Sequence, residues 1–266
     1  MKKVLITGHK GYIGQHLWQM IKKTRTDIEL YGIDLNGESG ENIDIRESFN
    51  VDTQFHTVIH LAALVRVGES VLHPSDYYDT NVDGTMNVLD TIKPHNFIFA
   101  STGAASNPTS PYGMSKRMAE DVVREKSYDY TIFRFYNVIG SDGFAPTNPD
   151  GLMSKLIEAT KTKVFNLYGT NYNTKDGSCV REYIHVNDIC RAIIKAIDKP
   201  SNSIENLAYG DTRTVFEIVD MFKRVNRVKF NTVEHPRRDG DLEACYLDIP
   251  SKFMERKYSY EEMLKV

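Results

Sequence analysis

A tyrosine and a lysine four residues apart, Tyr112 and Lys116, follow a threonine, Thr102, that ends an apolar run. Residues at this spacing share one face of a helix, so the phenol and the ammonium would project together. A nearby ammonium favours phenolate over phenol, which predicts a tyrosine able to accept a proton near neutral pH. The Thr102 hydroxyl could hydrogen-bond the same substrate oxygen. We therefore predict that Thr102, Tyr112 and Lys116 are catalytic.

A glycine-rich turn follows the apolar run at residues 4–7, with Gly8, Gly11 and Gly14 ahead of a helical pattern. Glycines let the backbone approach a pyrophosphate closely, and the helix N-terminus offers free amides and a positive dipole end. Asp34 ends the next predicted strand about 20 residues later, where a carboxylate accepts from ribose hydroxyls. It would repel a 2′-phosphate, so we predict bound NAD rather than NADP. Together with the tyrosine site, this predicts hydride transfer.

Short apolar runs alternate with helical patterns through the first half of the chain. We expect strands at residues 4–7, 28–33, 57–62, 96–101 and 130–135, and helices at residues 12–23, 76–92 and 112–125. This alternation predicts an α/β fold, a Rossmann-like doubly wound parallel sheet that binds ligands at the carboxyl ends of its strands. After residue 135 the pattern changes to loops, short strands and helices near 152–160, 186–197 and 215–225. We expect residues 1–137 and 184–210 to form the NAD-binding domain, and residues 138–183 and 211–266 a smaller interleaved lobe that binds substrate.

Composition excludes several classes of function. The 266 residues include 33 basic and 36 acidic ones, and this balance does not suggest a nucleic-acid partner. No run approaches the ~20 apolar residues that span a bilayer, and the apolar start is too short for a signal peptide. Cys179, Cys190 and Cys245 are few and widely spaced, so we expect neither a disulfide framework nor a metal site. We expect a cytoplasmic protein without a membrane partner.

Several further segments carry a family resemblance. They are His60-Leu-Ala-Ala63, Val67-Gly-Glu-Ser70, Tyr77-Tyr-Asp79 through Asn81-Val82, Arg134-Phe-Tyr-Asn137, Tyr168-Gly169, Asp176-Gly177, Val180-Arg-Glu-Tyr-Ile-His-Val186 and Pro236-Arg-Arg-Asp-Gly-Asp241. With the features above, they resemble the extended short-chain dehydrogenase/reductases over nearly the whole chain. The glycine turn is typical of that superfamily as a whole, whereas the later segments resemble its UDP-glucose (UDP-galactose) 4-epimerase branch. The resemblance implies reversible, NAD-dependent 4-epimerisation of a UDP-hexose through a 4-keto intermediate.

The resemblance also implies binding roles. Residues that would contact NAD are Gly8, Gly11, Tyr12, Ile13, Asp34, Asp44, Ile45, Leu61, Ala62, Ala63, Asn81, Tyr112, Lys116 and Tyr136. Residues that would hold the UDP-sugar are Thr102, Asn137, Leu152, Tyr168, Arg181, Arg238, Asp241 and Cys245. Two guanidinium groups suit a pyrophosphate because each donates in a fork. The resemblance further implies a homodimer through the helices predicted at 76–92 and 112–125.

The chain departs from the family pattern in several places, of which three bear on the binding sites. Residues between Asp34 and Asp44 lack the usual helix, and the stretch 104–111 is cut. Cys245 stands where relatives restricted to plain hexoses commonly carry a tyrosine. The smaller side chain would leave room for a 2-N-acetyl group, so the N-acetylated pair of UDP-sugars is a second expected substrate. The alternative is that Cys245 is simply a small core residue.

Other chemistries on this scaffold need other residues. Gly103-Ala104 follow Thr102 where nucleotide-sugar 4,6-dehydratases place an Asp-Glu pair, so no proton carrier for elimination is present. A glucuronate-type 4-epimerase or a 4-ketoreductase remains the nearest enzymatic alternative. A catalytically inactive NAD-binding module is the alternative of another class, and the intact Tyr112/Lys116 pair argues against it.

Overall fold

The computed structural model describes residues 1–38, 40–127, 129–238, 242–245 and 251–266. Within them the chain divides into two compact units, which we call unit 1 and unit 2. Unit 1 comprises Met1–Phe135 and Cys190–Asn206, and unit 2 comprises Tyr136–Ile189 and Leu207–Val266. Both units are therefore discontinuous in sequence. Their limits lie a few residues from those of the domains expected above, whose separate binding roles remain a prediction.

Unit 1 is built on a six-stranded sheet with the order β2-β1-β3-β4-β5-β9. The strands are β1 (Lys2–Thr7), β2 (Ile28–Ile33), β3 (Thr57–His60), β4 (Asn96–Thr102), β5 (Asp129–Phe135) and β9 (Ser203–Leu207). All pairings from β2 to β5 are parallel, so the predicted doubly wound α/β fold is confirmed. Strand order reverses between β1 and β3, and the loops after these two strands meet at the switch point where such sheets bind ligands.

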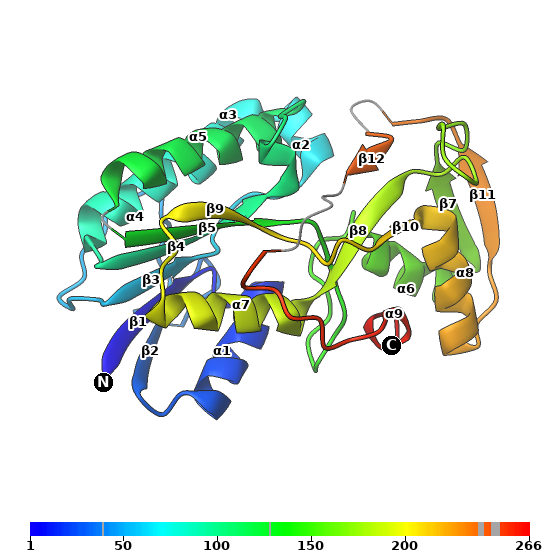
Figure 1. The fold of residues 1–266 in the computed structure, drawn as a ribbon. Helices are drawn as coiled ribbons and strands as arrows, with labels where there is room; N and C mark the ends of the chain where they lie inside the picture. The colour runs from blue at the N-terminus through cyan, green and yellow to red at the C-terminus, as the bar shows by residue number, and fades with distance from the viewer. Residues whose placement is uncertain (39, 128, 239–241, 246–250) are drawn as a thin grey trace. The chain divides into compact units, whose positions relative to one another are not determined.

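Helices cover both faces of this sheet. Figure 1 shows α4 (Gly84–Ile92) and α5 (Pro111–Lys126) on one face, and α1 (Tyr12–Thr24) with α7 (Val186–Asp198) on the other. The helix expected at 76–92 begins earlier, as α3 (Pro74–Tyr78), because proline suits a first helical turn. It then passes through a π-helical segment, η1 (Asp79–Asp83), before α4. A further short helix, α2 (Val67–Leu72), was not expected.

The segment between β2 and β3 folds as a compact loop. Among its described residues there is neither a helix nor a strand, as expected from the shortened sequence. The Asp34 amide donates to the Glu41 carbonyl (2.9 Å), and the Ile43 amide donates back to the Asp34 carbonyl (3.2 Å). Ile45 and Phe55 bury their side chains in the core of unit 1. The loop is thus closed by backbone pairing and anchored by two apolar residues instead of a helix.

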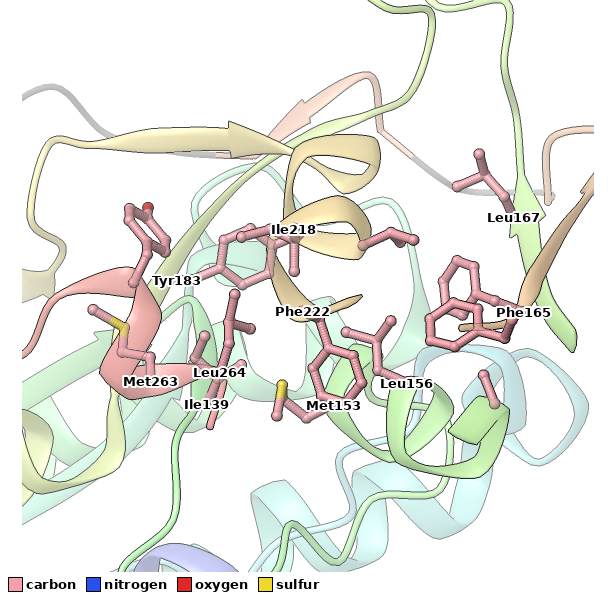
Figure 2. Close-up of a cluster of buried hydrophobic side chains, with 14 residues drawn as sticks. Ile139, Met153, Leu156, Phe165, Leu167, Tyr183, Ile218, Phe222, Met263 and Leu264 are labelled. Atoms are coloured by element: carbon pink, nitrogen blue, oxygen red, sulfur yellow. The ribbon is translucent and has the colours of Figure 1, made fainter. Parts of the chain in front are cut away.

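Unit 2 is centred on strand β8 (Val180–His185), which carries Arg181. Its other elements are β6 (Asn137–Ile139), α6 (Leu152–Thr162), β7 (Val164–Tyr168), β10 (Thr212–Thr214), α8 (Val215–Asn226), β11 (Asn231–His235), β12 (Ala244–Cys245) and α9 (Tyr260–Met263). Strand β10 pairs antiparallel with β8, whereas β12 and β6 pair parallel with it. Figure 2 shows the apolar core of this unit, in which Leu156, Phe222 and Met263 are fully buried.

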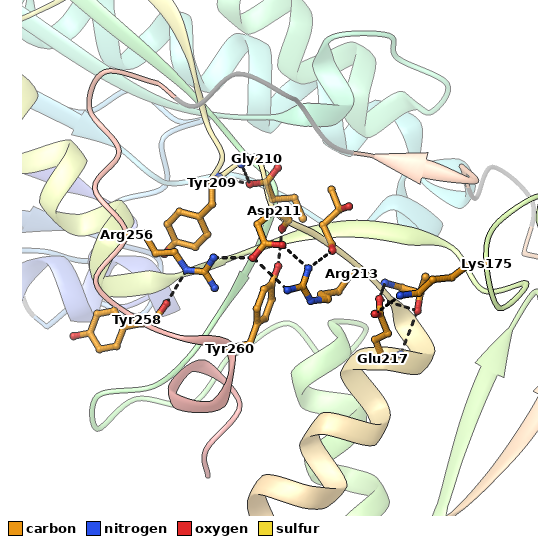
Figure 3. A network of polar contacts seen from close by, with 12 residues as sticks. Lys175, Tyr209, Gly210, Asp211, Arg213, Glu217, Arg256, Tyr258 and Tyr260 are labelled. Carbon is orange, nitrogen blue, oxygen red and sulfur yellow. Dashed lines mark hydrogen bonds and ion pairs between the residues drawn. The ribbon is translucent and has the colours of Figure 1, made fainter.

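A polar network ties the C-terminal segment to β10 (Figure 3). The Asp211 carboxylate accepts from Arg256 (2.7 Å) and from Arg213, and the Tyr260 hydroxyl donates to the Asp211 carbonyl (2.6 Å). Both guanidinium groups also lie within 5.0 Å of the Tyr260 ring centroid. The C-terminal segment is therefore fixed beside the strand that pairs with β8.

Candidate active site

The turn after β1 has the geometry that a pyrophosphate requires. Gly8 has φ +75°, and a Cβ atom at this position would lie 2.7 Å from the Ala62 amide nitrogen. A Cβ atom on Gly14 would collide with the Gly8 carbonyl. Gly11 caps α1 without a side-chain hydrogen bond, and no acidic residue occupies the first turn of that helix. The positive end of the α1 dipole therefore faces this turn without a carboxylate, which fits a dinucleotide.

Asp34 lies directly after β2, beside this turn. Its carboxylate accepts from the backbone amides of Lys10 (2.9 Å) and Asn36 (3.1 Å). Each oxygen keeps a further lone pair for ribose hydroxyls. Asp44 and Ile45, which were also expected on the adenosine side, make contacts within the protein. Asp44 binds Arg46, which lowers the pKa of the carboxyl, and Ile45 is a core residue with 5% exposure.

The three residues expected to be catalytic lie at the carboxyl end of β4 and the first turns of α5. Thr102 ends β4, and its hydrogen bond lowers the pKa of Tyr112, although burial raises that pKa more. Lys116 is 2% exposed, with Nζ 4.1 Å from the centroid of the Phe99 ring. Burial lowers the pKa of Lys116 to about 7. The structure therefore places Thr102 near enough to Tyr112 to influence its pKa, and Lys116 one turn along the same helix.

One part of the expected chemistry is not met by these residues. We expected the Lys116 ammonium to bring the Tyr112 pKa near neutral, but the Tyr112 pKa lies above its ordinary value. The reason is that both groups are buried, so that each charged form loses hydration. A tyrosinate at this site needs a further positive charge, and the oxidised nicotinamide ring of a bound NAD carries one.

Asn81 connects the loop after β3 to the catalytic helix. Its Oδ1 accepts from the Leu64 amide (2.9 Å), while Nδ2 donates to the Leu64 carbonyl (3.0 Å) and to Ser115 Oγ (3.0 Å). Both amide protons are therefore committed within the protein. The loop that Asn81 holds begins with the half-buried residues Leu61, Ala62 and Ala63. Asn81 therefore holds this loop, and its contribution to the cofactor groove remains a prediction.

A buried histidine beneath the same loop was assigned no role by sequence reasoning. Thr85 donates to the Asn81 carbonyl (2.7 Å), so its oxygen accepts from His60 Nε2 (3.0 Å). His60 Nδ1 then accepts from the Thr7 hydroxyl (2.7 Å). Burial lowers the pKa of His60 to about 3, so the ring is neutral. This chain of hydrogen bonds joins the ends of β1 and β3 to α4, which carries Thr85. In the sequence, only the His60-Leu-Ala-Ala63 motif indicated that His60 has a role here.

Residues expected to hold UDP lie in unit 2. The Tyr168 ring, 38% exposed at the end of β7, stacks on His235 with 5.0 Å between centroids. The Arg238 guanidinium lies 5.0 Å from the same Tyr168 ring. An aromatic face beside a fork of donors suits a base joined to a diphosphate.

The remaining substrate positions surround β8. Arg181 pairs with Cys245 across the β8–β12 bridge, and its Nη1 donates to the Val180 carbonyl (2.8 Å). Asn137 donates from Nδ2 to the Glu182 carbonyl (3.0 Å). Leu152 opens α6, Tyr136 is the first residue of unit 2, and Asp241 lies outside the described residues.

Over the described ranges, no three His, Cys, Asp or Glu side chains converge as metal ligands. Helices in the same part of the chain are all too short or too polar to cross a membrane.

A family model for the NAD dependent epimerase/dehydratase family matches residues 4–209. The chain belongs to this family. The match confirms both the family and the cofactor, NAD, that the motifs predicted. That family includes both epimerases and dehydratases, so the family match alone does not identify the reaction.

The similar curated proteins named here are UDP-glucose 4-epimerases. UDP-glucose 4-epimerase of Pasteurella multocida is 28% identical over 300 aligned positions, covering 92% of this chain and 89% of the relative. The Bos taurus enzyme of that name is 29% identical, covering 92% and 88%. Both alignments exceed the 266 residues of this chain, so these relatives carry segments that this chain lacks.

Solved structures of nucleotide-sugar 4-epimerases are also similar to this chain. UDP-glucose 4-epimerase from Bifidobacterium longum, in complex with NAD+ and UDP, is similar with a TM-score of 0.86 and 25% identity, covering 99% of this chain and 96% of that one. The UDP-Glc/GlcNAc 4-epimerase of Campylobacter jejuni gives a TM-score of 0.81 at 26% identity, covering 100% and 97%.

Proposed function

We propose that this protein is an isomerase with bound NAD that interconverts UDP-glucose and UDP-galactose by inversion at C4 of the hexose. The observation that carries the proposal is the placement of Thr102 near enough to Tyr112 to lower its pKa, with Lys116 one turn away on α5, in a chain of the epimerase/dehydratase family. The curated relatives named UDP-glucose 4-epimerase support the same reaction.

The chemistry of each residue follows from its place. Bound NAD supplies a hydride acceptor that can return the hydride to the same carbon. Tyr112 would take the proton of the 4-hydroxyl while Thr102 orients that oxygen; with the C4 hydride accepted by bound NAD, a 4-keto sugar would remain. Lys116 holds a positive charge beside the phenol. After the sugar has turned about its pyrophosphate link, Tyr112 returns the proton and the opposite C4 epimer forms, without net oxidation.

Unit 2 carries the residues that we propose to bind UDP. Tyr168 offers a ring face for the uracil, while Arg181 and Arg238 offer guanidinium donors for the pyrophosphate. Asn137, Leu152 and Asp241 would complete this site. This arrangement suits epimerisation, because the nucleotide would be bound firmly while the hexose remains free to rotate.

The deciding experiment is incubation of the purified protein with UDP-galactose without added NAD. We expect UDP-glucose to accumulate to equilibrium, observed by NMR of the anomeric and C4 protons. A panel that includes UDP-glucuronate separates the glucuronate-type epimerase, and a requirement for NADH would identify a 4-ketoreductase. Retained NAD with no conversion of any UDP-sugar would contradict the proposal and identify an NAD-binding module.

We propose that the N-acetylated pair is also a substrate and that Cys245 admits it. Cys245 is partly exposed on β12, opposite Arg181. Cys245→Tyr should lower kcat/KM for UDP-N-acetylglucosamine by about 10-fold or more through steric exclusion, and leave UDP-glucose unaffected. Cys245→Ser, which stays small, is the matched control. Unchanged N-acetyl turnover in the tyrosine variant would show that Cys245 is only a packing residue.

We further propose a cytoplasmic homodimer. Met86 on α4, together with Met114 and Met118 on α5, exposes between 37% and 42% of its surface, and such a stripe suits a second copy of these helices. Light scattering should give twice the mass of the 30.4 kDa chain, and Met118→Glu should return one chain. A wild-type protein of single-chain mass would contradict the dimer.

The free cysteines support the cytoplasmic location, because they suit a reducing compartment.

A further inference from the structure

A charged pair is buried beneath the catalytic helix. Glu120, on α5, is fully buried, and Arg134, on β5, is 8% exposed. Arg134 donates to both carboxylate oxygens, from Nε to Oε1 (2.7 Å) and from Nη2 to Oε2 (2.6 Å). Ser101 also donates to Oε1 (2.5 Å). Such a pair gains little net stability over apolar residues of the same shape, so its place in the fold calls for another explanation.

The pair joins every segment that carries a catalytic group. Ser101 immediately precedes Thr102 on β4 and lies opposite Arg134 in the sheet. Arg134 Nη1 donates to Ser106 Oγ (2.9 Å), in the loop that leads from Thr102 to α5. Glu120 lies on the buried face of α5, one turn beyond Lys116. The carboxylate therefore fixes α5 against β4 and β5 at the level of the active site.

The surroundings of Lys116 make Glu120 its principal counter-charge. On the sheet below are the Phe99 ring and the neutral His60, and Arg134 lies behind Glu120. The acidic residues of the neighbouring helices that point to solvent are Asp76, Asp79, Asp83 and Asp90. Glu69 on α2 accepts from the Tyr77 hydroxyl (2.8 Å), whose ring lies edge-on to Tyr112. Within the described part of the chain, no side chain accepts a hydrogen bond from Lys116.

We propose that Glu120 is a positioning residue for the reaction: it seats the catalytic helix through Ser101 and Arg134, and holds Lys116 in its ammonium form. The inference rests on the proposed role of Lys116. Burial pulls the pKa of Lys116 down to about 7, and the Glu120 carboxylate opposes that fall. Without this partner the pKa of Lys116 would fall further, so the side chain would be mostly neutral at pH 7 and the phenol would lose its neighbouring charge.

The test follows the Lys116 proton directly and needs no substrate. Protein labelled with 13Cε-lysine is titrated by NMR, and the Lys116 signal is assigned by its loss in Lys116→Met. In Glu120→Gln the titration midpoint should move down by about 1 pH unit. Glu120→Asp keeps the charge and should stay near the wild-type midpoint. In active protein, the alkaline limb of the kcat profile should move in the same direction as the midpoint.

A double variant guards against misfolding. Glu120→Gln alone leaves Arg134 buried without a counter-charge, which destabilises a fold strongly, whereas Glu120→Gln with Arg134→Met removes both charges together. The double variant should fold, and its Lys116 midpoint should lie between those of wild type and Glu120→Gln. A midpoint equal to wild type in the folded double variant would overturn the proposal and leave a purely structural tie. Because this readout is independent of turnover, absence of epimerase activity would count against the proposed function only.

Discussion

Replacement of Tyr112 by phenylalanine is expected to lower kcat for UDP-galactose by about 10³-fold, within the range that general base catalysis contributes. The variant loses only the hydroxyl that receives the proton, while the ring keeps its edge-on contact with Tyr77. Thr102 is too weak a base to replace it, so no buried group at this position accepts the 4-hydroxyl proton. Coupled assay of UDP-glucose formation measures the loss, and KM should change little.

Tyr130→Phe is the matched control for this prediction. Tyr130 also stands on an element of unit 1, β5, and packs its ring against the core of that unit. Its hydroxyl has no proposed part in the chemistry, so turnover should stay within a factor of about two of wild type. Both variants should retain the same content of NAD after purification. Undiminished turnover in Tyr112→Phe would remove that residue from the reaction and leave the identity of the base open.

The sequence predicted five of the six strands of the unit 1 sheet, because buried parallel strands are rich in apolar residues; the sixth strand, β9, was not expected. The strand expected at 28–33 has the observed bounds of β2. The short helix α2 was missed because a six-residue element has no repeating apolar face, and its Val71 and Leu72 lie largely in solvent. The π-helical segment η1 was missed because its wider turn leaves no mark on a 3.6-residue pattern.

The site was predictable where it depends on position along the chain. Thr102 was expected at the carboxyl end of a strand and Tyr112 on the helix that follows, and the structure has β4 and α5 at these positions; their catalytic roles remain a prediction. The balance of protonation was not predictable, because it depends on burial depth, which raises the pKa of Tyr112 and lowers that of Lys116. The role of Glu120 was hidden for a similar reason: its partner Arg134 lies on a different element.

Gly8→Ala is expected to weaken NAD binding by about 100-fold. An alanine at φ +75° costs about 1–2 kcal/mol in backbone strain. Its Cβ would also lie 2.7 Å from the Ala62 amide nitrogen, so the turn must move away from the loop after β3. A shift of the turn misaligns the amides at the start of α1, and each hydrogen bond to a charged group contributes about 1.5–3 kcal/mol. Loss of one or two such bonds corresponds to the stated change in Kd.

Calorimetry with NAD added to protein stripped of nucleotide measures this change, and the nucleotide released by acid from purified protein gives its occupancy. Gly68→Ala is the matched control, because a Cβ on this exposed residue of α2 meets nothing within 4 Å. Alanine favours a helix over glycine by about 1 kcal/mol, so the control should be no less stable than wild type and bind NAD equally well. The Gly8→Ala strain acts on the turn itself. The binding free energy of NAD should therefore decrease by more than the free energy of unfolding. Full occupancy by NAD in Gly8→Ala would mean that the pyrophosphate does not lie on the turn between β1 and α1.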